Sequence, residues 1–267
     1  MILPNIENFI GCDSSFEEAE IVLYGAPFDS TTSFRPGARF GPSPIRHESF
    51  GLETYSPYQD RDLTDIQVFD SGDLELCFGN TKKALAQIEE QAKEILDNSA
   101  IPFMLGGEHL VTLGAFRAVL EKYPDIHIIH FDAHADLREE YLGEQLSHAS
   151  VIRRCWDLVG DGRIYQFGIR SGDREEFYWA KEHVTMRKFD FEGLEEVLEK
   201  LEGTPIYFTL DLDVLDPSVF PGTGTPEPGG VTFDALRKAA EKVCSRANVV
   251  ACDVNELSPH YDPSGIS

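Results

Sequence analysis

The chain has 267 residues, of which 42% are hydrophobic and 26% charged, ordinary values for a globular protein that exclude wholesale disorder. A formal net charge of −24 argues against nucleic acids and anionic membranes as partners, because both are bound through Lys and Arg. The five cysteines are scattered and form no Cys-x-x-Cys pair, so we expect reduced thiols and a cytoplasmic protein.

Short apolar runs, rich in β-branched and aromatic residues, predict strands that are buried on both faces. In chain order they are Ile21–Gly25, Ile66–Asp70, Ile101–Leu105, Ile126–Phe131, Arg163–Ile169, Pro205–Leu210 and Asn248–Cys252. Apolar residues at helical spacing occur between them, as in Lys82–Asn98 and in Thr232–Cys244, where Thr232 is the expected N-cap. This alternation predicts one α/β domain across the chain, with helices on both faces of a parallel sheet.

Ionisable side chains follow several of the predicted strands directly. Along the chain they are His109, Asp132, His134, Asp136, Asp211, Asp213 and Glu256. Alternate side chains of extended backbone point the same way, and parallel α/β sheets bind ligands at the carboxyl ends of their strands. The Gly106-Gly107 pair permits a close-approaching turn that would present His109 to the same region. We therefore expect these side chains to share one cleft.

The expected cluster of carboxylates predicts a metal centre. Four buried carboxylates would carry a charge of −4 and raise one another's pKa values, whereas two divalent cations would cancel that charge. A set of oxygen ligands with a minority of imidazoles suits Mn²⁺ or another hard-to-borderline ion. Such a pair of ions supplies a hydroxide nucleophile from water near neutral pH.

Motifs along nearly the whole chain resemble those of the ureohydrolase family, the relatives of arginase and agmatinase. In order they are Gly25–Ser30, Arg35–Pro42, Asp70–Leu74, Gly106–His109, Asp132–Asp136, Asp211–Pro217, Gly222–Gly230 and Asp253–Pro259. Within this family, the segment Leu137–Ser150 looks most like that of the bacterial agmatinases.

The resemblance implies a three-layer α/β/α fold with a mostly parallel central sheet, assembled as a homotrimer or homohexamer. Residues 1–267 would form a single catalytic domain, and the family normally continues beyond the position of Ser267 into a C-terminal helix that this chain would lack.

The implied activity is metal-dependent hydrolysis of a C–N bond in a linear amidine, with two Mn²⁺ per chain and a small cationic guanidino substrate. The leading hypothesis is agmatinase, which converts agmatine and water to putrescine and urea in polyamine biosynthesis. Another guanidino or amidino hydrolase, such as arginase or guanidinobutyrase, is the nearest alternative. A catalytically silent family member that acts as a binding partner is a further one.

The resemblance also assigns roles to single residues, motif by motif. One ion would be held by His109, Asp132, Asp136 and Asp211, and the other by Asp132, His134, Asp211 and Asp213, with Asp132 and Asp211 as bridges. His148 matches the position of a proton-shuttling histidine, and Glu256 that of a carboxylate that engages the guanidinium. Asp136, as a ligand beside the nucleophile, would receive its proton.

Two further expectations concern residues near these motifs. By strand parity His130 faces the same side as Asp132, where it either supports that ligand or packs in the core, and His127 faces away. The segment Leu137–Ser147 contains three glutamates against one arginine, Glu139, Glu140 and Glu144 against Arg138. If it lines the site, its net charge of −2 favours a cationic substrate tail over a carboxylate; otherwise it is a solvated loop.

Overall fold

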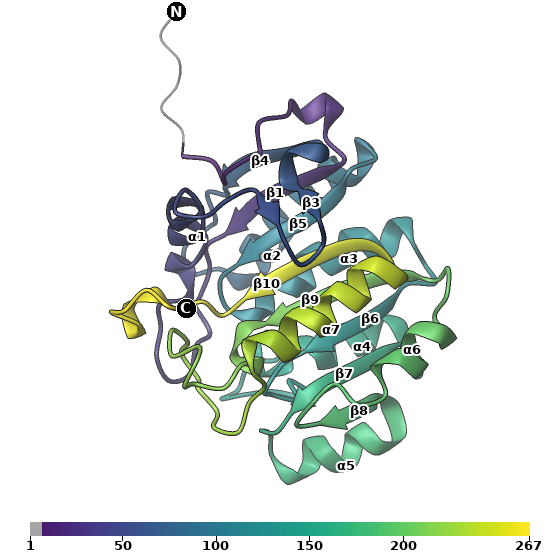
Figure 1. The fold of residues 1–267 in the computed structure, drawn as a ribbon. Helices are drawn as coiled ribbons and strands as arrows, with labels where there is room; N and C mark the ends of the chain where they lie inside the picture. The colour runs from purple at the N-terminus through teal and green to yellow at the C-terminus, as the bar shows by residue number, and fades with distance from the viewer. Residues whose placement is uncertain (1–6) are drawn as a thin grey trace, which may run out of the picture.

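The computed structural model describes residues 7–267 and contains an eight-stranded sheet (Figure 1). Its strands are β1 Ile21–Ala26, β4 Val68–Asp73, β5 Ile101–Gly106, β6 His127–Phe131, β7 Ile164–Ile169, β8 Thr185–Lys188, β9 Pro205–Asp211 and β10 Asn248–Asn255. They are ordered β4-β1-β5-β10-β9-β6-β7-β8, and every neighbouring pair is parallel. A separate antiparallel pair is formed by β2 Tyr55–Ser56 and β3 Arg61–Asp62.

Helices cover both faces of the sheet (Figure 1). One face is covered by α2 Thr81–Asp97, α3 Thr112–Lys122, α4 Val151–Val159 and α5 Arg174–His183. The opposite face is covered by α1 Pro42–Ser49, α6 Leu194–Lys200 and α7 Phe233–Arg246. The expected three-layer α/β/α fold with a parallel central sheet is therefore confirmed.

The core forms where the sequence pattern predicts it. The predicted stripe of α2 is buried, including Leu85, Ile88 and Ile95, and packs in the same apolar cluster as residues of β1 and β6. Thr232 caps α7 as expected, because its Oγ1 accepts a hydrogen bond of 3.2 Å from the amide of Ala235. Strand β8 was not predicted, since this short edge strand is only partly buried. Within residues 7–267 no helix is both long and apolar enough to cross a membrane.

The order of the strands decides where the ionisable residues meet. Strands β5, β10, β9 and β6 are consecutive neighbours in the sheet although they come from distant parts of the chain. β10 lies between β5 and β9 and pairs with both. Because all four are parallel, the residues that follow them emerge side by side at one edge of the sheet.

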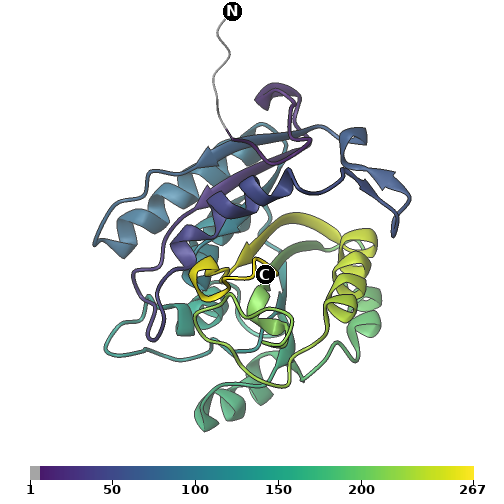
Figure 2. The ribbon, with the colours of Figure 1, turned by 60° about the vertical axis from the view of Figure 1, so that its left-hand side comes forward.

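Two segments are packed tightly at this edge. A side chain at Gly107 would overlap the backbone of Phe28, so only glycine permits the close approach that the sequence predicts before His109. The last residues of the chain lie beside α1 and the segment around Gly222 (Figure 2), where the Gly222 amide donates a 2.9 Å hydrogen bond to Ser267 Oγ.

Candidate metal centre and active-site cavity

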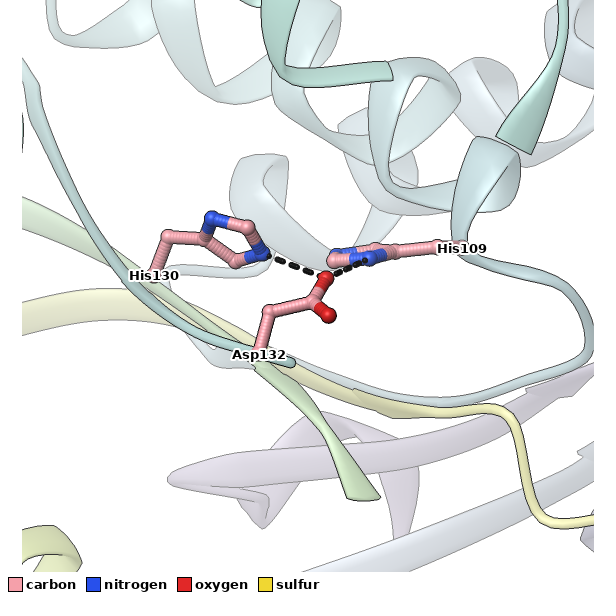
Figure 3. A group of neighbouring side chains, drawn as sticks. All are labelled: His109, His130 and Asp132. Carbon is pink, nitrogen blue, oxygen red and sulfur yellow. Dashed lines mark hydrogen bonds and ion pairs between the residues drawn. The ribbon is translucent and has the colours of Figure 1, made fainter. Parts of the chain in front are cut away.

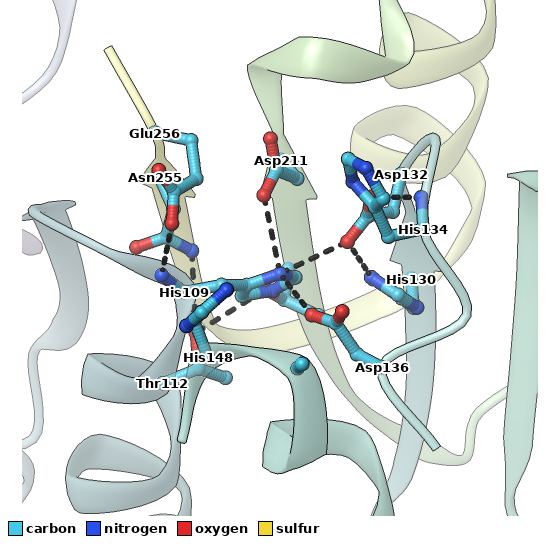
Figure 4. Close-up of polar contacts among 12 residues, drawn as sticks. His109, Thr112, His130, Asp132, His134, Asp136, His148, Asp211, Asn255 and Glu256 are labelled. Atoms are coloured by element: carbon cyan, nitrogen blue, oxygen red, sulfur yellow. Dashed lines mark hydrogen bonds and ion pairs between the residues drawn. The ribbon is translucent and has the colours of Figure 1, made fainter. Parts of the chain in front are cut away.

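His109 lies at the centre of a buried group of carboxylates (Figure 4). Its Nδ1 is 3.0 Å from Asp132 Oδ2, 3.2 Å from Asp136 Oδ2 and 3.3 Å from Asp211 Oδ2. This nitrogen is buried and has no hydrogen-bond partner among the described residues. Two ligand atoms bound to one cation at about 2.1 Å and at right angles lie about 3.0 Å apart. Each of the three distances from His109 Nδ1 therefore fits two ligands of one divalent cation, and the ligand atoms of His109, His130 and Asp132 all lie within 4.8 Å of one another.

A second group of ligand atoms adjoins the first. His134 Nδ1 lies 3.0 Å from Asp213 Oδ2 and 3.5 Å from Asp132 Oδ1. Asp132 thus directs one oxygen to each histidine, as a bridging ligand must. Asp211 Oδ1 accepts a 2.9 Å hydrogen bond from the amide of Asp213, which leaves Oδ2 to face His109. The six sequence-predicted ligands are all brought together.

The cluster carries more negative charge than its surroundings stabilise. Burial and the charge of Asp132 raise the pKa of Asp136 to about 7. Burial, Asp213 and Asp132 raise the pKa of Asp211 well above its usual range. Burial alone would lower the pKa of His109, but the carboxylates around it raise that pKa well above its ordinary value. Bound cations would relieve this excess charge.

The predicted metal ligands converge for a different reason from the one that the sequence suggested, which was that alternate side chains of extended backbone point the same way. β6 ends at Phe131, and Asp136 adopts a left-handed conformation with φ of 54°. Asp213 belongs to a 3₁₀-helix, Leu212–Val214, that follows β9. The ligands therefore meet because the loops turn them inward, and a strained backbone at Asp136 is held by its surroundings.

His130 supports a ligand. Figure 3 shows Asp132 between the rings of His109 and His130, and His130 Nε2 lies 2.8 Å from Asp132 Oδ2. His130 Nδ1 accepts a 3.0 Å hydrogen bond from Gln166 Nε2, so the proton of the neutral ring is on Nε2 and is donated to Asp132. Burial lowers the pKa of His130, in agreement with a neutral ring. Although His130 is close enough to join a metal group, both of its nitrogens are already used.

Thr209 orients His109 from behind, a contact that was missed from the sequence. The Thr209 hydroxyl donates a 2.6 Å hydrogen bond to Asp253, so its oxygen accepts the 2.9 Å bond from His109 Nε2–H. In the neutral ring, the form that can bind a metal ion, the lone pair of His109 then lies on Nδ1, toward the carboxylates. The sequence did contain a signal for this contact. Thr209 lies two residues before Asp211 on β9, so the two side chains point to the same side of the strand.

A cavity of about 280 Å³ opens onto the metal ligands. Its walls include His134, Asp136, Asp211, His148 and Glu256. A space of this size suits a small substrate. The cavity therefore joins the ligand cluster to both residues for which the sequence predicts a role in proton transfer or substrate binding.

His148 is positioned by hydroxyl groups. It begins a 3₁₀-helix, His148–Ser150, which is capped by Ser147. Burial, together with the charge of His134, lowers the pKa of His148 to about 4. The ring is therefore neutral near pH 7 and can accept a proton.

The side chain of Glu256, at the end of β10, is held by the backbone of the predicted metal ligand His109. Its Oε1 accepts a 2.8 Å hydrogen bond from the His109 amide, and its φ of 68° is left-handed. Burial and the nearby Glu108 raise the pKa of Glu256 well above its usual range. A cation in the cavity would offset that effect.

Of the two alternatives for the acidic segment Leu137–Ser147, the structure supports the solvated loop for its three glutamates. Glu139, Glu140 and Glu144 lie outside the cavity, and Glu139 is drawn away by Arg153 on α4 at 2.7 Å. The residues of this segment that line the cavity are Arg138 and Tyr141, whose ring centroid is 4.6 Å from the guanidinium carbon. Asp173 and Glu176, at the start of α5, supply the carboxylates of this wall.

Glu227 is a further residue that the sequence reasoning passed over, although it lies in the recognised segment Gly222–Gly230. Its Oε1 lies 3.6 Å from His134 Nε2 and accepts a 2.8 Å hydrogen bond from Ser171. Arg170 holds the same segment, because it donates to the Glu227 carbonyl at 2.8 Å and to the Asp213 carbonyl at 2.8 Å. Glu227 therefore lies within ion-pair distance of the His134 nitrogen that faces away from Asp132.

Comparison with known proteins agrees with this arrangement. The family model described as "Arginase family" matches residues 19–267. An agmatinase from Bacillus anthracis is 53% identical over 259 residues, covering 96% of this chain and 89% of the relative, and one from Bacillus subtilis strain 168 is 51% identical with the same coverage.

A solved structure from Clostridium difficile, described as a candidate agmatinase, superposes with a TM-score of 0.93 at 53% identity. The match covers 95% of this chain and 93% of that one. The resemblance inferred from the motifs is confirmed, and the chain belongs to the arginase family, whose members depend on a binuclear metal centre.

Proposed function

We propose that the protein is an agmatinase, which hydrolyses agmatine to putrescine and urea with two Mn²⁺ per chain. The observation that carries this proposal is that the ligand cluster, His148 and Glu256 all line one cavity of about 280 Å³. The Bacillus relatives, about half identical in sequence, support the choice of agmatine. We also propose a role for the product in polyamine biosynthesis.

The metal ligands proposed are those of the sequence analysis, namely His109, Asp132, His134, Asp136, Asp211 and Asp213. Their mixture of carboxylates and imidazoles supports Mn²⁺ over ions that prefer thiolates. When bound, the ions would supply the nucleophile from water and neutralise the buried carboxylates.

Side chains that line the cavity would bind the substrate and transfer the protons. A guanidinium is a poor electrophile, because its positive charge is spread over three nitrogens, so it must be held firmly for attack. Glu256 would hold it through a charge-assisted hydrogen bond. Asp136, as a ligand beside the nucleophile, would take the proton that the nucleophile loses. The neutral His148 would relay a proton to the departing amine.

The tail of agmatine ends in an ammonium, whereas that of arginine also carries a carboxylate. Asp173 and Glu176 line the cavity, and Arg138 lies 3.5 Å from Asp173 and 3.4 Å from Glu176. Two carboxylates against one guanidinium favour a cationic tail over an anionic one. The preference thus rests on α5 rather than on the acidic segment after the metal motif.

Substrate choice is tested by urea release in the presence of manganese. We expect kcat/KM for agmatine to exceed that for arginine by at least about 10²-fold, equivalent to roughly 2.7 kcal/mol of differential transition-state binding. 4-Guanidinobutyrate, in which a carboxylate replaces the terminal CH₂–NH₃⁺ group of agmatine, serves as the matched substrate control and should also be poor. Equal or better hydrolysis of arginine would contradict the agmatinase proposal but leave guanidino hydrolysis intact.

Metal loading should depend on pH. Because the pKa values of Asp136, His109 and His134 are raised, these groups keep protons up to near-neutral pH and must release them to bind a cation. We expect manganese to bind more tightly at about pH 8 than at about pH 6, with proton release on binding. Calorimetry in two buffers of different ionisation enthalpy measures that release, and Asp136→Asn should reduce it. Affinity independent of pH over this range would contradict the ligand assignment.

The other expectations from the sequence remain proposals of the same kind. The resemblance supports a homotrimer or homohexamer of a single catalytic domain over residues 1–267. The free thiols of all five cysteines support a location in the reducing cytoplasm.

A further inference from the structure

Glu108 is a buried carboxylate for which the proposed reaction has no use. It is 0% exposed and lies beside the ligand His109, but its oxygens face the loop after β1 instead of the ligand cluster. Its Oε1 accepts a 2.6 Å hydrogen bond from the Thr31 hydroxyl, and its Oε2 accepts a 2.8 Å bond from the Thr31 amide. The Thr32 hydroxyl adds a longer bond of 3.3 Å to Oε2. Glu108 therefore fixes the position of Thr31 from two sides.

Thr31 in turn contacts His148. The amide of His148 donates a 3.0 Å hydrogen bond to Thr31 Oγ1, and the ring nitrogen Nδ1 lies 3.4 Å from the same oxygen. Ring nitrogen Nε2 lies 3.3 Å from Ser33 Oγ, and Ser33 lines the cavity. One short loop thus connects the buried Glu108 to both nitrogens of His148.

Proton counting decides the direction of these hydrogen bonds. A threonine hydroxyl has a single proton, and that of Thr31 is donated to Glu108 at 2.6 Å. Toward His148 the Thr31 oxygen can therefore only accept, so its contact with Nδ1 is a hydrogen bond when the ring proton is on Nδ1, where Ser147 Oγ at 3.4 Å can accept as well. In the neutral ring Nε2 then carries the lone pair, on the side of Ser33 and the cavity.

We propose that Thr31 is a positioning residue for His148, and that Glu108 and Thr31 together select the ring form in which Nε2 exchanges protons with the cavity. Nε2 accepts a proton from the cavity and later returns it there, while Nδ1 keeps its own proton on Thr31. No proton passes along the loop, because the single proton of the Thr31 hydroxyl stays in its hydrogen bond to Glu108. This inference rests on the proposed role of His148.

The test compares isosteric variants of Thr31 in the manganese-loaded enzyme with agmatine. Thr31→Val removes the hydroxyl and should lower kcat roughly 3- to 10-fold, the effect of one hydrogen bond, while KM and the two manganese ions per chain are retained. Thr31→Ser keeps the hydroxyl and should restore kcat to within about 2-fold of the wild type. Thr32→Val is the matched control, because Thr32 bonds Glu108 without a hydrogen bond to His148, and should change kcat less than about 2-fold.

A second comparison separates an effect on His148 from a general effect on the loop. In the His148→Ala background, Thr31→Val should change kcat by less than about 2-fold, because the residue through which it acts is gone. An equal loss in both backgrounds, or loss of manganese from the Thr31→Val enzyme, would overturn the inference. If Thr31→Val does not fold, Thr31→Ala removes the same hydroxyl without adding an apolar branch and gives the same comparison.

The two hypotheses fail in different ways. A His148→Ala enzyme with unchanged kcat would reject the proposed function of His148 itself. An impaired His148→Ala enzyme together with an unimpaired Thr31→Val enzyme would reject only the positioning role of Thr31.

Discussion

Replacing Asp211 by alanine should abolish the metal centre as a whole. Asp211 Oδ2 faces His109 Nδ1, and the family resemblance implies that Asp211 bridges both ions. We therefore expect the Asp211→Ala variant to bind neither ion stably. Activity should fall by at least about 10³-fold, because a metal centre contributes several kcal/mol of transition-state stabilisation. Elemental analysis after manganese loading and urea release measure the two effects.

The stability of the same variant provides a second readout. Since burial and the neighbouring carboxylates raise the pKa of Asp211, its ionised form destabilises the metal-free fold at neutral pH. Metal-free Asp211→Ala should therefore melt no lower than the metal-free wild type. Saturating manganese, at about 100 times its Kd, should stabilise the wild type by about 2.7 kcal/mol but not the variant. Asp125→Ala, exposed at the amino end of β6, is the control and should behave as the wild type.

The second large effect is expected at His148. His148→Ala should lower kcat by roughly 10²- to 10⁴-fold, the range for loss of a general acid or base, with both metal ions retained. The metals should remain because the hydrogen-bond partners of the His148 ring are hydroxyls rather than metal ligands. Steady-state kinetics and metal analysis of the same preparation measure both quantities.

A histidine outside the cavity serves as the control for this variant. His183 pairs with Asp161 and stacks on Trp179 at the end of α5, so His183→Ala should leave kcat unchanged. Loss of the metal ions from His148→Ala would mean that this histidine is a ligand or a structural residue. An unchanged kcat would mean that water or another group carries the proton.

The fold could be predicted because burial on both faces leaves a simple signature. Strands such as β6 and β9 must be apolar along their length, and the helices between them carry one apolar stripe. β8 lacks that signature, since an edge strand with Arg187 and Lys188 needs little burial. The ligand residues could be predicted for a related reason, because parallel strands deliver whatever follows them to one edge of the sheet.

The directions of side chains in loops could not be predicted in this way. Asp136 and Glu256 reach the cavity through left-handed backbone conformations that no apolar pattern encodes. Glu139 turns away because Arg153 lies across from it in space, a contact 14 residues distant that composition does not reveal. The link from Glu108 through Thr31 to His148 joins three separated segments, so only the folded chain shows it.

The place of β10 in the sheet has a consequence for how the protein is made. In the sheet, β10 is the strand that joins β5 to β9. A nascent chain that ends before Asn248 therefore contains two half-sheets, β4-β1-β5 and β9-β6-β7-β8, with no strand to connect them. His109 follows a strand of one half, whereas Asp132 and Asp211 belong to the other. During translation the ion-binding residues cannot be brought into register until this penultimate stretch has left the ribosome. We therefore expect the metal site to form only after β10 has been added to the sheet, so a chain that ends before Asn248 should not bind the ions stably.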